Sequence, residues 1–129
     1  MEGIPIADAH CDFLYYMLQE GWDINHPTSR QAVSIPYMQA SNVALQFFAA
    51  WIDGDAKKNG ITQCLALLDA YWRMLEQYPD RLVPLTTDFQ PEPGKTATVL
   101  TIEGGEGIEG SLEACLLYTS PSPRDTERS

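Results

Sequence analysis

The chain contains a nearly continuous apolar run, Val43-Ala44-Leu45-Gln46-Phe47-Phe48-Ala49-Ala50-Trp51. We predict a strand over residues 42–52, because an apolar run without alternation is typical of a strand that helices cover on both faces. Polar residues and glycines come directly after the run and end it. This stretch therefore predicts the centre of a parallel sheet.

Two other stretches predict strands of the same kind. Residues 4–12 form a short strand that ends in polar residues, and residues 96–102 form a strand that leads into Glu103-Gly104-Gly105. We expect both strands to be buried and parallel to the strand at 42–52. The three strands should lie side by side.

Helical patterns separate these strands. Residues 13–20 form a compact helical stretch, and Gly21 can end it in the left-handed conformation. Residues 22–32 form a turn-rich loop that contains His26. We expect His26 to be structural or solvent-facing.

The clearest helix is predicted over residues 62–78. Thr62 can cap its start, and Pro79 ends it. The apolar stripe at helical spacing comprises Leu65, Leu68, Trp72 and Leu75, widened by Tyr71 and Tyr78. We expect this stripe to pack in the core. Residues 82–85 then form a short extended piece, and residues 88–95 form a proline-rich loop. Strands that alternate with helices predict an α/β fold with a parallel sheet.

Composition narrows the possible functions. The chain has 129 residues, which suits a single domain, and 44% of them are hydrophobic, which excludes a disordered chain. With 18 acidic and 8 basic side chains, the net charge is −10, so we expect no binding to nucleic acid. We find no membrane segment and no signal peptide, and therefore expect a cytoplasmic protein. The three cysteines form no C-x-x-C pair, so we expect reduced thiols.

The end of the chain departs from this pattern. Residues 119–129 contain no apolar anchor. A disordered natural tail is one interpretation, and the other is that residues 116–125 resemble translated sequencing-adapter sequence. We expect a domain over residues 1–114 and a disordered, non-native tail over residues 115–129.

His10 and Asp12 are the first candidate site residues. Residues two apart on a strand point to the same face, so their side chains should converge. An imidazole and a carboxylate together can bind Zn²⁺, which accepts nitrogen and oxygen ligands. Asp8 shares this face, one step deeper in the strand. The alternative is a histidine that only hydrogen-bonds to a neighbouring carboxylate.

Glu103 is the third candidate, at the carboxyl end of the predicted strand 96–102. Carboxyl ends of parallel strands open on one face of a sheet or barrel, where sites are built. Glu103 should therefore lie near His10 and Asp12. A cation is one of the few ways to stabilise a buried carboxylate there, although a solvated loop carboxylate is the alternative.

These stretches together resemble a known family. Asp8-Ala9-His10-Cys11-Asp12 is similar to the opening D-x-H-x-D of the membrane (renal-type) dipeptidases, zinc metallopeptidases of the amidohydrolase superfamily. Residues 43–51 resemble the second strand of that family, and residues 99–113, with Ile102-Glu103-Gly104-Gly105, resemble its I-E-G-G block most closely. The resemblance covers about residues 4–114.

The resemblance implies a (β/α)₈ TIM-type barrel with two zinc ions and a small dipeptide substrate. His10 and Asp12 would bind one zinc ion, and Glu103 would bridge both. The ions would activate a water that attacks the scissile amide. We expect no catalytic residue in this chain beyond these metal ligands.

The length of the chain departs from the family. A barrel of this type needs about 250 residues, so we expect only its N-terminal portion, an incomplete barrel that is inactive alone. The family's other zinc ligands come from later strands and have no counterpart here. The complete enzyme is expected to be a homodimer. The alternatives are another metal-dependent hydrolase of the amidohydrolase superfamily, or a non-catalytic acidic α/β binding module.

Overall fold

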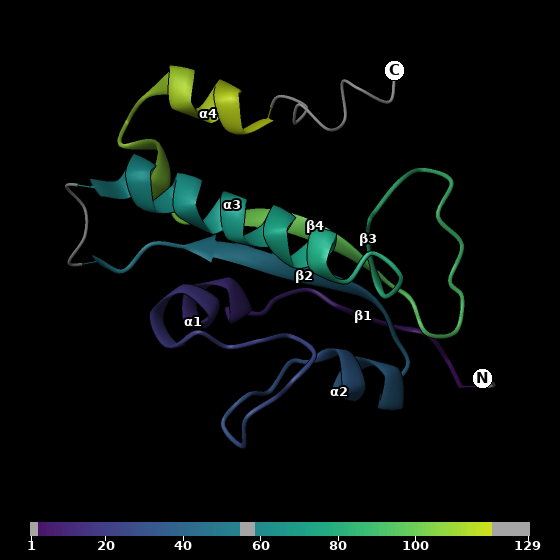
Figure 1. The fold of residues 1–129 in the computed structure, drawn as a ribbon. Helices are drawn as coiled ribbons and strands as arrows, with labels where there is room; N and C mark the ends of the chain where they lie inside the picture. The colour runs from purple at the N-terminus through teal and green to yellow at the C-terminus, as the bar shows by residue number, and fades with distance from the viewer. Residues whose placement is uncertain (1–2, 55–58, 120–129) are drawn as a thin grey trace.

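Four strands form one sheet in the computed structural model of the protein, which describes residues 3–54 and 59–119 (Figure 1). The strands are β1 (Ile6–Asp8), β2 (Val43–Trp51), β3 (Leu82–Pro84) and β4 (Thr96–Glu103). Their order across the sheet is β1-β2-β4-β3, and every pairing is parallel. The predicted α/β class with a parallel sheet is confirmed. The described strands form an open sheet, and closure into a barrel stays a prediction.

The first helix, α1 (Phe13–Glu20), has the predicted bounds, and Gly21 ends it with φ 68° in the left-handed region. Glycine reaches this conformation without steric cost. Phe13 and Leu14 at the start of α1 are buried in the core. Because α1 begins one residue after Asp12, its packing also holds the turn that leads out of β1.

The core lies between one face of β2 and the helices. Phe48 is fully buried and contacts the rings of Phe13 on α1 and Tyr71 on α3 (Gly60–Gln77). Alternate side chains on β2, such as Leu45 and Phe47, point to the other face and are only half-buried. The expectation that helices cover both faces of this strand is therefore wrong for the described residues.

The helix α3 starts earlier than predicted, and its predicted apolar stripe packs in or against the core except at Leu65. Thr62 does not cap it, because Asn59 precedes its first residue, Gly60. Leu65 is 44% exposed, while Cys64, Leu67 and Met74 are buried. Tyr71 and Leu75 of the predicted stripe are buried as expected, and the stripe is wrong only at Leu65, which is exposed.

The first strand is shorter and more exposed than predicted. Only Ile6–Asp8 is a strand, and Ile4 and Ile6 are 85% and 47% exposed. β1 lies at the edge of the sheet and pairs only with β2, so nothing in the described structure covers its outer side. The expectation of a buried strand over residues 4–12 is wrong for this reason.

Two further elements are not among those predicted from the sequence. The helix α2 (Ile35–Ala40) starts at Ser34, whose hydroxyl accepts the N–H of Tyr37 at 3.1 Å, and Pro36 occupies its first turn. Both features are known start signals for helices. β3 (Leu82–Pro84) is a true edge strand, where we expected only an extended piece.

The last described helix, α4 (Leu112–Thr119), crosses the boundary expected between residues 114 and 115. Its Tyr118 donates a hydrogen bond to the carbonyl of Gly107 at 2.7 Å. Residues 115–119 are therefore helical, whereas we expected disorder from residue 115. Residues 120–129 lie outside the described part of the chain, and the foreign origin of the tail stays a prediction. None of the described helices is both long and apolar enough to cross a membrane.

A close backbone contact joins the start of α3 to the turn after β4. Gly60 lies against the carbonyl group of Glu106, at the start of the 3-10 helix η2 (Glu106–Ile108), so that a methyl group on Gly60 would collide with this carbonyl. The neighbouring Gly107 lies against the side chain of Cys64. At Gly60 no side chain fits between the two segments, whereas at Gly107 a methyl group would require a small shift of the Cys64 side chain.

We expect Gly60→Ala to lower the free energy of unfolding by about 1–3 kcal/mol, the usual cost of overpacking. The collision is with a main-chain carbonyl, which cannot rotate away as a flexible side chain can. Urea denaturation measures the change. Gly105→Ala is the matched control, because nothing lies within 4 Å of a methyl group there and φ is −102°. It should change stability by less than about 0.5 kcal/mol. Equal effects of the two substitutions would contradict the close contact.

Candidate metal centre

His10, Asp12 and Glu103 come together at the carboxyl ends of two strands. His10 and Asp12 lie in the turn between β1 and α1, and Glu103 is the last residue of β4. β2 runs between these strands, with Trp51 opposite Glu103. The expected placement of all three residues at one edge of the sheet therefore agrees with the geometry.

The reason for the convergence differs from the predicted one. His10 and Asp12 come after the strand instead of belonging to it, so strand alternation does not align them. The carbonyl of Cys11 accepts the N–H of Ala49 at 3.0 Å and ties this turn to β2. Cys11 is buried, which leaves the side chains on either side of it at the surface of the turn.

The ligand atoms of the three residues all lie within 4.8 Å of one another. The Nε2 atom of His10 is 3.2 Å from Oδ1 of Asp12 and 3.6 Å from Oε2 of Glu103. About half of each side chain is exposed, at 50% for His10, 43% for Asp12 and 48% for Glu103. The group is thus open to a ligand from solvent.

One atom of this group favours a cation. Oδ1 of Asp12 is buried and has no hydrogen-bond partner among the described residues, although the rest of its side chain is exposed. This oxygen lies 3.2 Å from Nε2 of His10, a contact that is an ion pair only when the imidazole is protonated, and a metal ion bound by both residues would stabilise the buried oxygen. One imidazole and two carboxylates also form a donor set that zinc accepts. The residues present therefore fit a divalent metal.

Two neighbours support the turn but do not belong to the group. Oδ1 of Asp8 accepts the N–H of His10 at 3.3 Å. Burial, together with the charges of Asp8 and Asp12, raises the pKa of the Cys11 thiol to about 12 against hydrogen bonds that lower it. The thiol is therefore neutral near pH 7 and does not compete for the metal as a thiolate.

The turn after Glu103 is fixed by its own contacts. Glu109 has φ 48°, and its Oε2 accepts the N–H of Ile61 at 2.6 Å, at the start of α3. An anion at this end of a helix also interacts favourably with the helix dipole. Together with the contact between Gly60 and Glu106, this hydrogen bond ties the turn that follows Glu103 to the start of α3.

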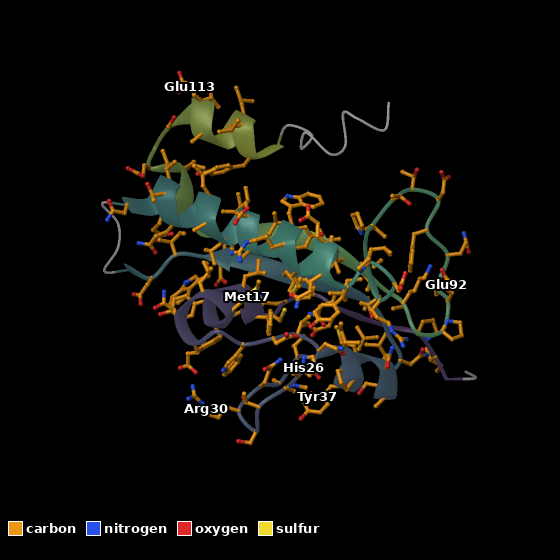
Figure 2. The ribbon with its side chains drawn as sticks, in the orientation of Figure 1. Met17, His26, Arg30, Tyr37, Glu92 and Glu113 are labelled. Atoms are coloured by element: carbon orange, nitrogen blue, oxygen red, sulfur yellow. The ribbon has the colours of Figure 1, made fainter. Side chains whose placement is uncertain are left out.

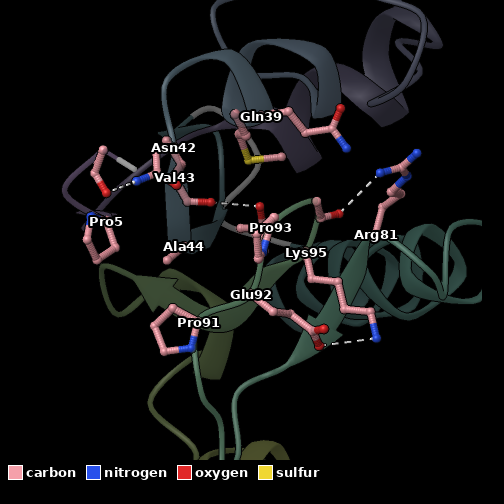
Figure 3. A pocket seen from close by; sticks show the side chains of 14 residues that line it. Pro5, Gln39, Asn42, Val43, Ala44, Arg81, Pro91, Glu92, Pro93 and Lys95 are labelled. Atoms are coloured by element: carbon pink, nitrogen blue, oxygen red, sulfur yellow. Dashed lines mark hydrogen bonds and ion pairs between the residues drawn. The ribbon is translucent and has the colours of Figure 1, made fainter. Parts of the chain in front are cut away.

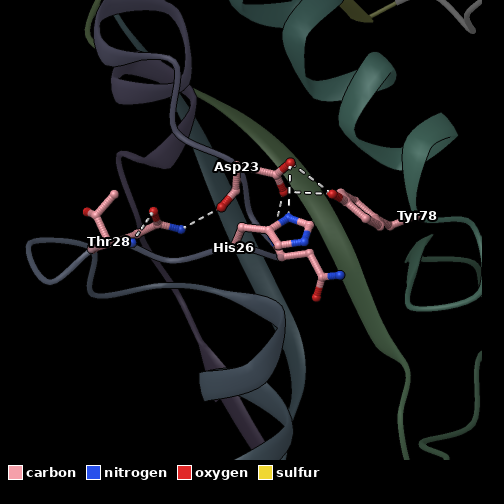
Figure 4. Close-up of polar contacts among 6 residues, drawn as sticks. Asp23, His26, Thr28 and Tyr78 are labelled. Atoms are coloured by element: carbon pink, nitrogen blue, oxygen red, sulfur yellow. Dashed lines mark hydrogen bonds and ion pairs between the residues drawn. The ribbon is translucent and has the colours of Figure 1, made fainter.

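His26 lies outside the metal group, as expected. Figure 2 and Figure 4 show it on the loop between α1 and α2, where its Nδ1 is 3.4 Å from Oδ2 of Asp23 and its side chain is 74% exposed. The hydroxyl of Tyr78 donates to both carboxylate oxygens of Asp23, at 2.7 and 2.9 Å. His26 thus belongs to a contact that joins this loop to the end of α3.

Of two cavities in the structure, one lies away from the metal group and the other is lined by two of its residues. The one in Figure 3, about 510 Å³, lies at the amino ends of β2 and β4, where Lys95 forms an ion pair with Glu92 at 3.3 Å. That end is opposite Glu103. The other cavity, about 690 Å³, is lined by His10 and Asp12 and reaches Trp22 and Arg30. From the sequence we expected only a turn-rich loop at residues 22–32. An aromatic residue and an arginine in the same loop were the signal that could have indicated a ligand cavity there.

Comparison with known proteins assigns a family. The sequence matches the family described as membrane dipeptidase (peptidase family M19) over residues 1–120, and the chain belongs to this family. It is 22% identical over 135 residues to Dipeptidase aclJ of Aspergillus oryzae, which covers 89% of this chain and 32% of that protein. It is 27% identical over 119 residues to Dipeptidase 3 of Rattus norvegicus, which covers 87% of this chain and 24% of that protein. The chain thus spans a third or less of these relatives.

The contact between Tyr78 and Asp23 generates a prediction about pH. Burial, together with the hydrogen bond to Asp23 and its charge, raises the pKa of Tyr78 from 10.0 to about 12. Desolvation opposes ionisation of Asp23, but hydrogen bonds from Tyr78, the N–H of Asn25 and His26 prevail and lower its pKa. A raised tyrosine pKa adds stability that is complete below pH 10 and is lost as pH rises through 12.

We expect Tyr78→Phe to lower the free energy of unfolding by about 1 kcal/mol near pH 7, the value of one hydrogen bond. The variant should also lose less stability than the parent chain between pH 9 and 11. Urea denaturation across this range checks both statements. Tyr37→Phe, at an exposed tyrosine, is the control and should change neither value. A parallel loss of stability with pH in Tyr78→Phe and the parent would contradict the assignment.

Proposed function

We propose that this protein acts as a metal-dependent dipeptidase-type hydrolase, with His10, Asp12 and Glu103 as metal ligands. The observation that supports this most directly is the meeting of one ligand atom from each of three residues within 4.8 Å, where Asp12 also has a buried oxygen that makes no hydrogen bond among the described residues. Membership of the membrane dipeptidase family and two relatives named dipeptidase support the reaction class.

Each residue has a separate task in the proposed site. His10 and Asp12 would hold a zinc ion from the β1–α1 turn, and Glu103 would hold metal from β4. When bound, zinc supplies an activated water and polarises the scissile carbonyl of a dipeptide. Asp8 fixes the main chain at His10, and the neutral Cys11 anchors the turn in the core. The half-exposed side chains leave room for a small substrate.

The rest of the proposal concerns the longer protein. Because the chain spans a third or less of its relatives, we propose that residues outside it complete a second metal position and the substrate site. We also propose that the complete enzyme is a cytoplasmic homodimer with a closed barrel. The half-buried apolar face of β2, which includes Leu45 and Phe47, would then line the barrel interior.

We expect the 129-residue chain to bind about one zinc ion, because three protein ligands suffice for a catalytic zinc site. Asp12→Asn should weaken binding by about tenfold or more, since an amide lacks the charge of the carboxylate. Isothermal titration calorimetry with zinc measures both. His26→Ala is the control and should retain the parent affinity. Unchanged affinity in Asp12→Asn, or a loss in His26→Ala, would sink the ligand assignment and would favour a non-catalytic binding module.

We expect the chain alone to hydrolyse no dipeptide above background, because it offers too few ligands for two metal ions. A chimera with the part of Dipeptidase 3 beyond the matched region should hydrolyse dipeptides. In that chimera, Glu103→Gln should lower kcat by about 100-fold or more, because a neutral amide replaces a charged metal ligand. An assay of released amino acids with a dipeptide panel measures this. Full turnover in Glu103→Gln would contradict the proposed role of Glu103.

A further inference from the structure

A cavity of about 690 Å³ connects the metal group to the loop between α1 and α2. Its volume lies within the range of about 300–1,000 Å³ that is common for small-ligand sites. His10 and Asp12 line it, and Arg30 belongs to the same lining. The aromatic side chains of Phe13, Tyr16 and Trp22 also contribute to its wall. The cavity therefore has polar groups at the metal ligands, an aromatic wall and one arginine.

Arg30 is held in place by stacked aromatic rings. Its guanidinium carbon lies 5.7 Å from the centroid of the Trp22 ring, and Trp22 stacks on Tyr16 with a centroid distance of 4.7 Å and an interplanar angle of 22°. Figure 2 shows the Arg30 side chain at the edge of the molecule, on the loop between α1 and α2. This stacking restricts the guanidinium at low cost, because both groups are planar.

Arg30 keeps the capacity to bind an anion. One of its nitrogens is 3.1 Å from Oε1 of Glu20, in an ion pair whose side chains are 66% and 36% exposed. Exposed pairs of this kind contribute at most about 1 kcal/mol, so a ligand carboxylate can compete with Glu20. The guanidinium has five N–H donors and binds a carboxylate in bidentate geometry. Among the residues that line the cavity, the other charged side chains are acidic apart from His10.

We propose that Arg30 is a specificity-determining residue that binds a carboxylate on the side chain of the substrate. The aromatic side chains that line the same cavity suit the methylene groups of such a side chain, and the guanidinium suits its end. This inference rests on the proposed function, and it names the preferred substrate class as dipeptides that contain glutamate or aspartate. Without Arg30, Asp8 and Asp12 would repel such a side chain.

The test compares two isosteric peptides, Ala-Glu and Ala-Gln, on the zinc-loaded 129-residue chain. Quenching of tryptophan fluorescence reports binding, because Trp22 lies beneath Arg30. We expect Ala-Glu to bind about tenfold more tightly than Ala-Gln, as one charged bidentate contact allows. Arg30→Gln should abolish the difference, and Arg30→Lys should retain part of it. Arg73→Gln is the matched control, because Arg73 also forms an exposed ion pair, with Asp69 at 2.8 Å, but on α3. It should retain the full preference.

Further measurements show which carboxylate of the peptide Arg30 binds, and they distinguish this proposal from the proposed function. The C-terminally amidated forms of both peptides should show the same preference, because the amide removes only the main-chain carboxylate. Four results would each overturn the role of Arg30. These are loss of the preference on amidation, equal binding of Ala-Glu and Ala-Gln, no detectable binding of either peptide, and a preference that survives Arg30→Gln. A preference that requires Arg30 and persists in Asp12→Asn without zinc would support Arg30 independently of the metal, and the zinc titration of Asp12→Asn tests the metal-dependent function separately.

Discussion

β2 and β4 pair in parallel over seven residue pairs, from Leu45 opposite Ala97 to Trp51 opposite Glu103. This ladder is the longest in the described sheet, and its register fixes where β4 ends. The same two strands present Phe48 and Thr98 to α3, where Tyr71 contacts the Phe48 ring and shares a 2.6 Å hydrogen bond with Thr98. A slip of one residue would reverse which side chains face the helix, so burial of these groups also fixes the position of Glu103.

The position of Glu103 depends equally on the turn that leads from β4 to α4. Gly60 approaches the carbonyl of Glu106 more closely than any other residue type would allow, and Glu109 accepts a hydrogen bond from the first turn of α3. On the other side of β2, the carbonyl of Cys11 is bonded to Ala49. The turn that carries His10 and Asp12 and the turn that follows Glu103 are thus both tied to elements of the core. The site can bring together groups that repel one another because the surrounding packing holds them.

Much of the fold could be predicted from periodicity, because α1 and β4 have patterns that local spacing defines. Periodicity gave a wrong prediction where several neighbouring side chains are apolar and tertiary contacts decide which of them are buried. In α3 several neighbouring side chains are apolar, and tertiary contacts such as that between Cys64 and Gly107 bury Cys64 while Leu65 stays exposed. The continuous run of β2 suggested helices on both faces, whereas the described helices pack on the face of Phe48. The short helix α2 has clear start signals at Ser34 and Pro36 but too few residues to show a helical stripe.

For the candidate site, the sequence by itself indicated the three candidate ligands and their meeting at one edge of the sheet, since parallel strands all end there. It placed His10 and Asp12 within the strand, whereas the structure places them after it. It also determined the excess of acidic charge, which sums over residues regardless of the fold. The tertiary structure alone decided that Oδ1 of Asp12 is buried without a hydrogen-bond partner and that Arg30 shares a cavity with His10. Burial and cavities arise from residues that are distant along the chain, and no local pattern encodes the distance between side chains on separate turns.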